Sequence, residues 1–445
     1  MSTGGGDAGG AGRLLKVLGV AFGVAVIIGN TIGMGILRTP GEVAARLPSV
    51  PLFLGVWVLG GAYALLGALS LSELGAMLPR SGGQYVFVRR ALGAYPGFVV
   101  GWSDWLSTCG TMAAISMVMG EYIGPLVPAL AGREAYTAAV VVVAFGLLQW
   151  RGVRVGDATQ QITSLLKTVA LFALALAILF LARSGPGAPT HATVAVPTGL
   201  AFAGAVVVAL QSAIYTYDGW TGPIYFGEEV RQPGRDIPRA MIGGVLLVLA
   251  IYLALNAAFL RVVPIGDMAG DPFVAATAAA TVFGPAGDTI IRVLMIVSMV
   301  AAVNACQLMA SRVPLAMSRD GLLPERVTRV NAGGTPVTSL VLGTLAALAF
   351  IATGTFDAVL ALLAFFFVAN YTLSFVSLFV LRRREPDLPR PFRVPGYPWL
   401  PAIALVGSVA FLVGAVLGDR TNSLRALALL ALSLPAYLWA RRRVV

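Results

Sequence analysis

Three polar residues stand out because each lies within a long apolar stretch: Asn30, Lys167 and Asp218. Lys167 is one of only two lysines among 31 basic residues, the other being Lys16. A charge inside a membrane is costly, and an ammonium, unlike a guanidinium, can lose its proton when it is desolvated. We therefore interpret Lys167 as a functional charge. The alternative is a lysine near a helix end that reaches the lipid headgroups, which its polar neighbours at 157–164 would allow.

Glycines and a proline accompany the other two polar residues. Asn30 lies in VIIGNTIGMGI, residues 26–36, and Asp218 lies in YTYDGWTGP, residues 215–223. Glycine costs backbone entropy in a helix, and proline removes a hydrogen bond. Unwound backbone is tolerated within a membrane only where protein buries it or where it lines a wet cavity. Both segments therefore predict interrupted helices.

Composition assigns the chain to the polytopic membrane proteins. Its 445 residues are 58% apolar and 11% charged, with a mean hydropathy of +0.85, unlike a soluble domain. A spanning helix needs about 20 apolar residues. About twelve spans are predicted. Eleven is the alternative, because the fourth span is short and the ninth and tenth spans nearly touch at Asp357. Their expected ranges are 17–44, 51–77, 94–127, 136–150, 158–182, 197–226, 240–261, 286–312, 336–354, 357–381, 398–418 and 424–440.

The basic residues predict orientation. Most fall in the segments on one side of these spans, which indicates that both termini are cytoplasmic. The net charge of +11 then reflects topology and contact with anionic lipid, and no nucleic-acid partner is expected. Residues 1–16 begin with a Gly-rich stretch and are predicted to form a disordered tail without a cleavable signal. Abundant Ala, Gly and Arg suggest a bacterial source, which would place the chain in the cell inner membrane.

The two interruptions fall in the first and sixth predicted spans. Such a pair points to inverted five-helix repeats with a substrate site between them. Gly29 and Gly33 also have the small-xxx-small spacing of a helix-packing face, but that spacing does not explain Asn30, Gly35 or the second interruption.

The interruptions also indicate a ligand. A half-helix that begins at Gly35 offers free N–H groups and a positive dipole end to a carboxylate. The half-helices that end at 28–31 and 215–218 leave carbonyl groups without helical partners, and these suit an ammonium. Together the two sets fit the backbone of an α-amino acid.

Several motifs resemble one known family, the amino acid-polyamine-organocation transporters, and especially their L-amino acid transporter-like branch. The resemblance covers nearly the whole chain. Its motifs are IGMGI at 32–36, ELGAMLPRSGGQY at 73–85, WRGVR at 150–154, YDGW at 217–220 and RRREPDLPRP at 382–391.

The resemblance implies an all-α integral membrane protein of the leucine-transporter type. Helices 1 and 6 would be unwound at mid-membrane. The first inverted repeat would span 17–182 and the second 197–381, with two extra helices at 398–440. The implied activity is transport of L-amino acids by alternating access, as an exchanger or a proton-coupled symporter.

The resemblance also implies roles for single residues. The substrate carboxylate would meet the amides of Gly33, Met34 and Gly35, and the amine would meet carbonyls of Thr31, Tyr215 and Asp218. Tyr215 would be the aromatic gate, with a packed core tyrosine as the alternative, and Trp220 would serve in gating or in simple packing. Lys167 would take the place of sodium, with Gly29 and Ser298 as its partners, either as a fixed charge or as the proton carrier.

Two departures from the family pattern affect the expected ligand and partners. Met34 stands where the family usually has a small residue, so the substrate's identity stays open. No cysteine lies in 125–134, so no disulfide-linked accessory subunit is expected; Cys109 and Cys306 fall within predicted spans. We expect no cofactor and no metal site.

Other functions remain as alternatives. A transporter of cationic amino acids or polyamines would use Asp218, but no second carboxylate is evident at the site. A membrane-embedded enzyme would need metal ligands or a nucleophile with a base, and the only histidine is His191, in a predicted loop. An amino acid sensor is a further alternative that labelled flux would separate from a transporter. Glu228 and Glu229 could form a cytoplasmic ion-pair gate with Arg80 or Arg151, or lie on a solvated loop.

Overall fold

The computed structural model describes residues 14–33, 35–182, 195–354, 356–418 and 420–442. Within these ranges the chain is helical, and three isolated β-bridges are its only extended pairings. The helices are α1 (Val20–Thr31), α2 (Gly35–Arg46), α3 (Val50–Met77), α4 (Gln84–Leu92), α5 (Ala94–Ile123), η1 (Pro128–Leu130), α6 (Glu134–Trp150), α7 (Val153–Leu181), α8 (Gly199–Thr216), η2 (Gly222–Tyr225), α9 (Pro233–Val262), α10 (Ile265–Met268), α11 (Val274–Phe283), α12 (Ala286–Ala310), α13 (Arg312–Arg319), η3 (Glu325–Thr328), α14 (Val337–Thr353), α15 (Phe356–Arg384), α16 (Trp399–Gly418), α17 (Arg420–Ala431) and α18 (Ser433–Arg442).

Length and apolarity make this a multi-pass membrane protein. In the described ranges seven helical segments can cross a bilayer, and the bent pair α1 and α2 would add an eighth. Helices α6, α11 and α14 are apolar but shorter. The all-α class predicted from the sequence is confirmed. The count of twelve spans stays a prediction, since α5 and the α17–α18 pair are not among these candidates.

Helix ends lie at both segments where the sequence predicted interruptions. Helix α1 ends at Thr31 and α2 begins at Gly35, with a bend of 51° between them. Helix α8 ends at Thr216, and turns lead into the short helix η2, which has Pro223 in its first turn. Proline suits a first helical turn because its missing N–H would have no partner there. The depth of these interruptions within a bilayer stays a prediction.

Other boundaries differ from the sequence prediction. Helix α9 begins at Pro233, not near residue 240, because another proline opens its first turn. The segment between the seventh and eighth predicted spans contains two helices that the sequence did not predict, α10 and α11. Helix α4 was also not predicted. These helices have 4 to 10 residues, too few for a long apolar run to reveal.

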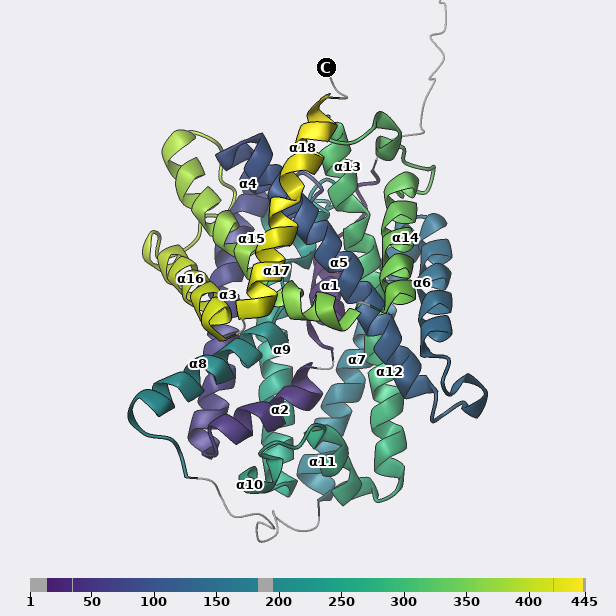
Figure 1. Cartoon of the computed structure of the whole chain (residues 1–445), viewed down its shortest axis with the longest axis vertical. Helices are drawn as coiled ribbons and strands as arrows, with labels where there is room; N and C mark the ends of the chain where they lie inside the picture. Colours follow the sequence, from purple (N-terminus) through teal and green to yellow (C-terminus); the bar gives the residue numbers. More distant parts are fainter. Residues whose placement is uncertain (1–13, 34, 183–194, 355, 419, 443–445) are drawn as a thin grey trace, which may run out of the picture.

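The broken first helix lies at the centre of the molecule. Helix α1 packs against α7, α9 and α12, while α3 packs on α9 and α5 packs on α12. Figure 1 shows the long helices around this centre, with α4 and α13 toward one end of the molecule and α10 and α11 toward the other. Before Asn30, helix α1 is apolar on all sides, as its burial requires. This packing holds the interruption after Thr31 inside the protein.

Candidate functional site

The two interruptions lie against each other. Gly219, which follows Asp218, has a φ of +113°, a conformation that favours glycine. A Cβ atom at this position would lie 2.8 Å from Thr31 N and 2.9 Å from the Asn30 side-chain nitrogen. Asn30 Nδ2 also donates a long hydrogen bond of 3.5 Å to Gly219 O. The absence of a side chain at Gly219 therefore lets the second interruption approach the first.

One tyrosine joins the ends of both broken helices. Tyr252 on α9 is fully buried, and its hydroxyl lies 3.0 Å from Thr31 O and 2.9 Å from Thr216 O. These carbonyls belong to the last residues of α1 and α8, which have no helical partner. The Tyr252 hydroxyl can donate its single proton to either carbonyl oxygen. Sequence reasoning missed Tyr252; the available signal was a tyrosine within an apolar helix, whose hydroxyl must find a partner when buried.

Lys167 binds the end of α1. Its Nζ donates to Gly29 O at 3.0 Å, to Ile32 O at 2.5 Å and more distantly to Ile28 O at 3.4 Å. Only 1% of its surface is exposed, so the side chain does not reach the headgroups. Ser298 on α12 donates to the same Ile32 O at 3.0 Å. The structure therefore brings together Lys167, Gly29 and Ser298, as expected, around a carbonyl of Ile32 that the sequence did not reveal.

Further side chains of α7 extend this contact with α1. Gln160 Nε2 and Ser164 Oγ donate to Ala25 O at 3.1 and 2.7 Å, and Asn304 Nδ2 donates to Gln160 Oε1 at 2.7 Å. Gln160, Ser164 and Lys167 have the i, i+4, i+7 spacing of one helix face. Two of the polar residues near Lys167, Gln160 and Ser164, thus face α1 and do not lead Lys167 toward the lipid headgroups. That spacing was a signal in the sequence.

The expected carboxylate side is described only in part, because Met34 lies outside the described residues. At Gly33 an added Cβ would meet nothing within 4 Å, so the space beside this backbone is open. At Gly35 an added Cβ would lie 2.8 Å from Thr216 Cγ2. Gly35 therefore lets α2 and α8 pack closely, in addition to any role of its amide.

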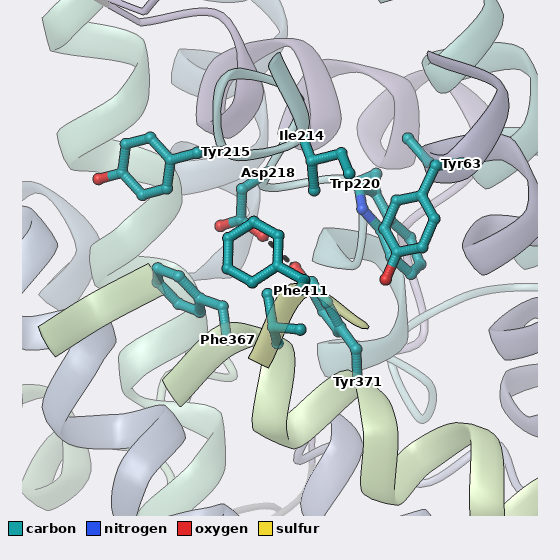
Figure 2. Close-up of a pocket in the computed structure, with 10 residues that line it drawn as sticks. Tyr63, Ile214, Tyr215, Asp218, Trp220, Phe367, Tyr371 and Phe411 are labelled. Carbon is teal, nitrogen blue, oxygen red and sulfur yellow. Dashed lines mark hydrogen bonds between the residues drawn. The ribbon is translucent and has the colours of Figure 1, made fainter. Parts of the chain in front are cut away.

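The remaining expected residues gather around a second place. Tyr215, Asp218 and Trp220 line a cavity of about 10 Å³, near the lower limit for one water molecule. Figure 2 shows Asp218 directed toward Tyr371 of α15, whose hydroxyl donates to its carboxylate. The centres of the Trp220 and Tyr371 rings lie 4.9 Å apart. The remaining lining residues are Tyr63, Ala64, Ile214, Phe367, Val368 and Phe411.

Tyr215 is not a packed core residue. Its exposed fraction is 41%, and in Figure 2 its hydroxyl points away from the other labelled side chains. Its carbonyl accepts a 3.1 Å hydrogen bond from the Asp218 N–H. Among the described lining residues none comes from α1 or α2. The expected site residues thus form two groups, one around Ile32 and one around Asp218.

A second buried carboxylate, that of Asp104, is not among the described residues that line this cavity. Asp104 on α5 is buried, with 1% of its surface exposed. Its Oδ1 accepts from the Tyr225 hydroxyl at 2.7 Å, whereas Oδ2 has no hydrogen-bond partner among the described residues. Buried ionisable side chains within a membrane protein are typical of binding or transport pathways.

The ion pairs of Glu228 and Glu229 differ from the prediction. Glu229 is buried and accepts two bonds from Arg312, at 2.7 and 3.1 Å, instead of pairing with Arg80 or Arg151. Glu228 pairs with Arg319 at 2.7 Å, partly exposed to solvent. The Arg312 guanidinium carbon also lies 4.9 Å from the centre of the Phe226 ring. Sequence distance concealed these pairs, because Arg312 ends the eighth predicted span and Arg319 follows it.

Arg80 instead pairs with Asp320, at 3.1 Å, and Arg89 lies 3.1 Å from the other oxygen of the same carboxylate. The segment after α3 is therefore attached to the segment after α13. Within the described ranges no group of three or more His, Cys, Asp and Glu side chains could hold a metal ion.

Comparison with known proteins agrees with this architecture. The model of a family described as amino acid permease matches residues 17–430. The serine/threonine exchanger SteT of Bacillus subtilis (strain 168) is 30% identical over 447 residues, covering 97% of this chain and 98% of that protein. The b(0,+)-type amino acid transporter 1 of Mus musculus is 26% identical, covering 91% and 84%. The large neutral amino acids transporter small subunit 2 of Homo sapiens is 28% identical, covering 87% and 74%. This chain belongs to the amino acid permease family, within the superfamily that its motifs resemble.

Proposed function

We propose that the chain is a secondary active transporter of L-amino acids that works by alternating access. The observation that carries this proposal is the contact between the two interrupted helices at Gly219 and Asn30. Interrupted helices that meet inside a transporter provide free backbone groups for a zwitterionic ligand. The open space at Gly33 is the place proposed for the substrate carboxylate, and the carbonyls of Tyr215 and Asp218 are proposed for the amine.

Lys167 supplies the proposed coupling. Its ammonium bridges carbonyls at the end of α1, where the helix dipole favours a cation. A movement of α1 would break these bonds, so the state of Lys167 and the position of α1 depend on each other. A fixed charge here suits an exchanger, and a charge that can be released suits proton symport.

The wider architecture is part of the same proposal. Residues 17–182 and 197–381 would be the two inverted repeats, and 398–440 would add two helices. Both termini would be cytoplasmic in a cell inner membrane. The relatives include an exchanger of serine and threonine, which makes these two amino acids the first substrates to test.

Uptake into proteoliposomes tests the proposal and separates the modes. Labelled L-amino acids, beginning with L-serine and L-threonine, are offered to vesicles that are empty or preloaded, with and without an inward proton gradient. Stimulation by preloading would indicate exchange, and stimulation by the gradient alone would indicate symport. Specific binding without flux of any labelled amino acid would instead favour a sensor.

A cationic substrate is the second candidate, and Asp104 is the observation that favours it. Its buried Oδ2, which has no hydrogen-bond partner among the described residues, would attract a second positive group. Under this alternative Asp104→Asn lowers uptake of labelled L-arginine or putrescine far more than uptake of L-serine. Equal effects on all substrates would leave the neutral amino acid proposal in place.

A further inference from the structure

A cavity lies at the beginning of α9, away from both groups of site residues. It measures about 520 Å³, whereas the cavity beside Asp218 measures about 10 Å³. One wall is the first turns of α9, and the other is the segment between α15 and α16. Its lining residues are Gly234, Arg235, Pro238, Arg239, Ile242, Gly243, Pro391 and Phe392.

The wall opposite α9 is held in place by a buried carboxylate. Glu73 on α3 has no exposed surface, and it accepts two bonds of 2.6 Å from Arg382 and one of 2.7 Å from the Val394 N–H. Arg390 donates to the carbonyls of its own segment, including Glu385 O at 2.8 Å. Pro391 therefore lies on an anchored segment, so close to α9 that a Cβ at Gly234 would lie 2.6 Å from it. The cavity is built into the fold.

Two arginines give the cavity its charge. Arg235 and Arg239 are one helical turn apart on the exposed side of α9. Arg235 lies 3.5 Å from the carboxylate of its neighbour Asp236, and Arg239 has no ion-pair partner in the described part of the chain. Arg239 is thus available to an anion, and Arg235, whose side chain is 58% exposed, can offer the donors that do not face Asp236. The planar arrays of donors on guanidinium groups match a phosphate.

The same face of α9 is apolar beyond the arginines. Continuing at helical spacing, the exposed positions are Gly243, Leu246 and Ala250. A Cβ at Gly243 would meet nothing within 4 Å, which leaves a notch directly after Arg239. Helix α9 is long and apolar enough to cross a membrane. The arginines therefore lie at the end of a span and the notch lies toward the hydrocarbon, an arrangement that matches a headgroup and an acyl chain.

We propose that this cavity binds an anionic glycerophospholipid, with its phosphate on Arg235 and Arg239 and an acyl chain along Gly243 and Leu246. Basic pockets at the cytoplasmic end of membrane helices attract acidic headgroups, and the predicted orientation places this end in the cytoplasmic leaflet. A soluble phosphate would use the arginines but would gain nothing from the apolar stripe. The proposal does not depend on the transported substrate.

Native mass spectrometry of the purified protein with phosphatidylglycerol and phosphatidylcholine tests this inference. Wild type should bind phosphatidylglycerol more tightly than phosphatidylcholine. The double substitution Arg235→Gln with Arg239→Gln should weaken phosphatidylglycerol binding roughly 30-fold, since two basic contacts are lost. Phosphatidylcholine binding should be unchanged. The matched control is Arg326→Gln with Arg329→Gln, which removes two exposed arginines near η3 and should leave the preference intact.

Equal phosphatidylglycerol affinity in wild type and the α9 variant would overturn the proposal, as would an equal loss in the control. Displacement of the lipid by inorganic phosphate at similar concentration would also overturn it, in favour of a soluble anion. If the double variant does not fold, Gly243→Leu provides a second test that keeps both charges. This substitution should fill the notch and weaken phosphatidylglycerol binding, and unchanged binding would contradict the proposed acyl-chain contact.

Discussion

Lys167 and Ser298 both donate to one carbonyl, that of Ile32, from helices α7 and α12. Their meeting with Gly29 could be predicted because a resemblance placed three positions of the sequence in one site. The Ile32 carbonyl and Tyr252 could not, since a backbone acceptor leaves no pattern in a sequence and a single tyrosine resembles any buried aromatic. Asp104 was overlooked for a similar reason, because its importance lies in an oxygen that has no hydrogen-bond partner in the described part of the chain.

Gly33→Ala tests the proposed carboxylate position. The added methyl group enters open space, so the fold should be retained, while an amino acid carboxylate should lose access to the backbone. We expect the KM for uptake to rise about tenfold, which corresponds to about 1.4 kcal/mol. Gly204→Ala on the exposed side of α8, which also has nothing within 4 Å, is the matched control. A normal KM in Gly33→Ala would exclude a substrate contact at this backbone.

At the scale of helices, the interruptions were predictable because glycine, proline and buried polar residues act locally. Their mutual contact was not, since it depends on residues distant in the sequence, such as Tyr252 on α9, which joins the ends of α1 and α8. Helices α4, α10 and α11 were missed because they are too short to contain a long apolar run. Most ends of the long apolar helices were predicted to within a few residues. The start of α9 was misplaced because its first turns are polar and carry the arginines of the second cavity.

Gly219→Ala should destabilise the protein. The residue has a φ of +113°, and a methyl group would also press against Asn30 and Thr31. The backbone strain alone should cost about 1–3 kcal/mol, and the lost approach of the two interruptions should reduce uptake as well. Thermal unfolding in detergent checks the first effect, with Gly204→Ala again as the control. A variant with normal unfolding and normal uptake would contradict the proposed role of this contact.

At the scale of the molecule, buried and half-buried ion pairs connect segments far apart in the sequence. Glu229 reaches Arg312, Arg80 reaches Asp320 and Glu73 reaches Arg382. The class and the family could be predicted from composition and motifs. These pairs could not, because several arginines were equally plausible partners for each acid. For this reason the prediction that Glu229 pairs with Arg80 or Arg151 was wrong.

Adjacent glutamates offer a direct comparison of buried and exposed ion pairs. Glu229→Gln leaves the Arg312 charge buried without a carboxylate, so we expect the free energy of unfolding to fall by about 3–5 kcal/mol. Glu228→Gln breaks a pair whose side chains are 25–30% exposed and should cost about 1 kcal/mol or less. Thermal unfolding of both variants decides the point. Equal midpoints of thermal unfolding in the two variants would show that burial does not set the strength of these ion pairs.

The most direct test of amino acid transport through a Lys167-bound first helix is exchange of labelled L-serine or L-threonine by wild type, Lys167→Ala and Lys16→Ala in matched, preloaded proteoliposomes. Lys16 is exposed, so its variant controls for the loss of a lysine. We predict exchange by wild type and Lys16→Ala, and loss of exchange by Lys167→Ala with the fold retained. Normal exchange by Lys167→Ala would remove Lys167 from the mechanism, and no flux of any amino acid by wild type would contradict the proposed function.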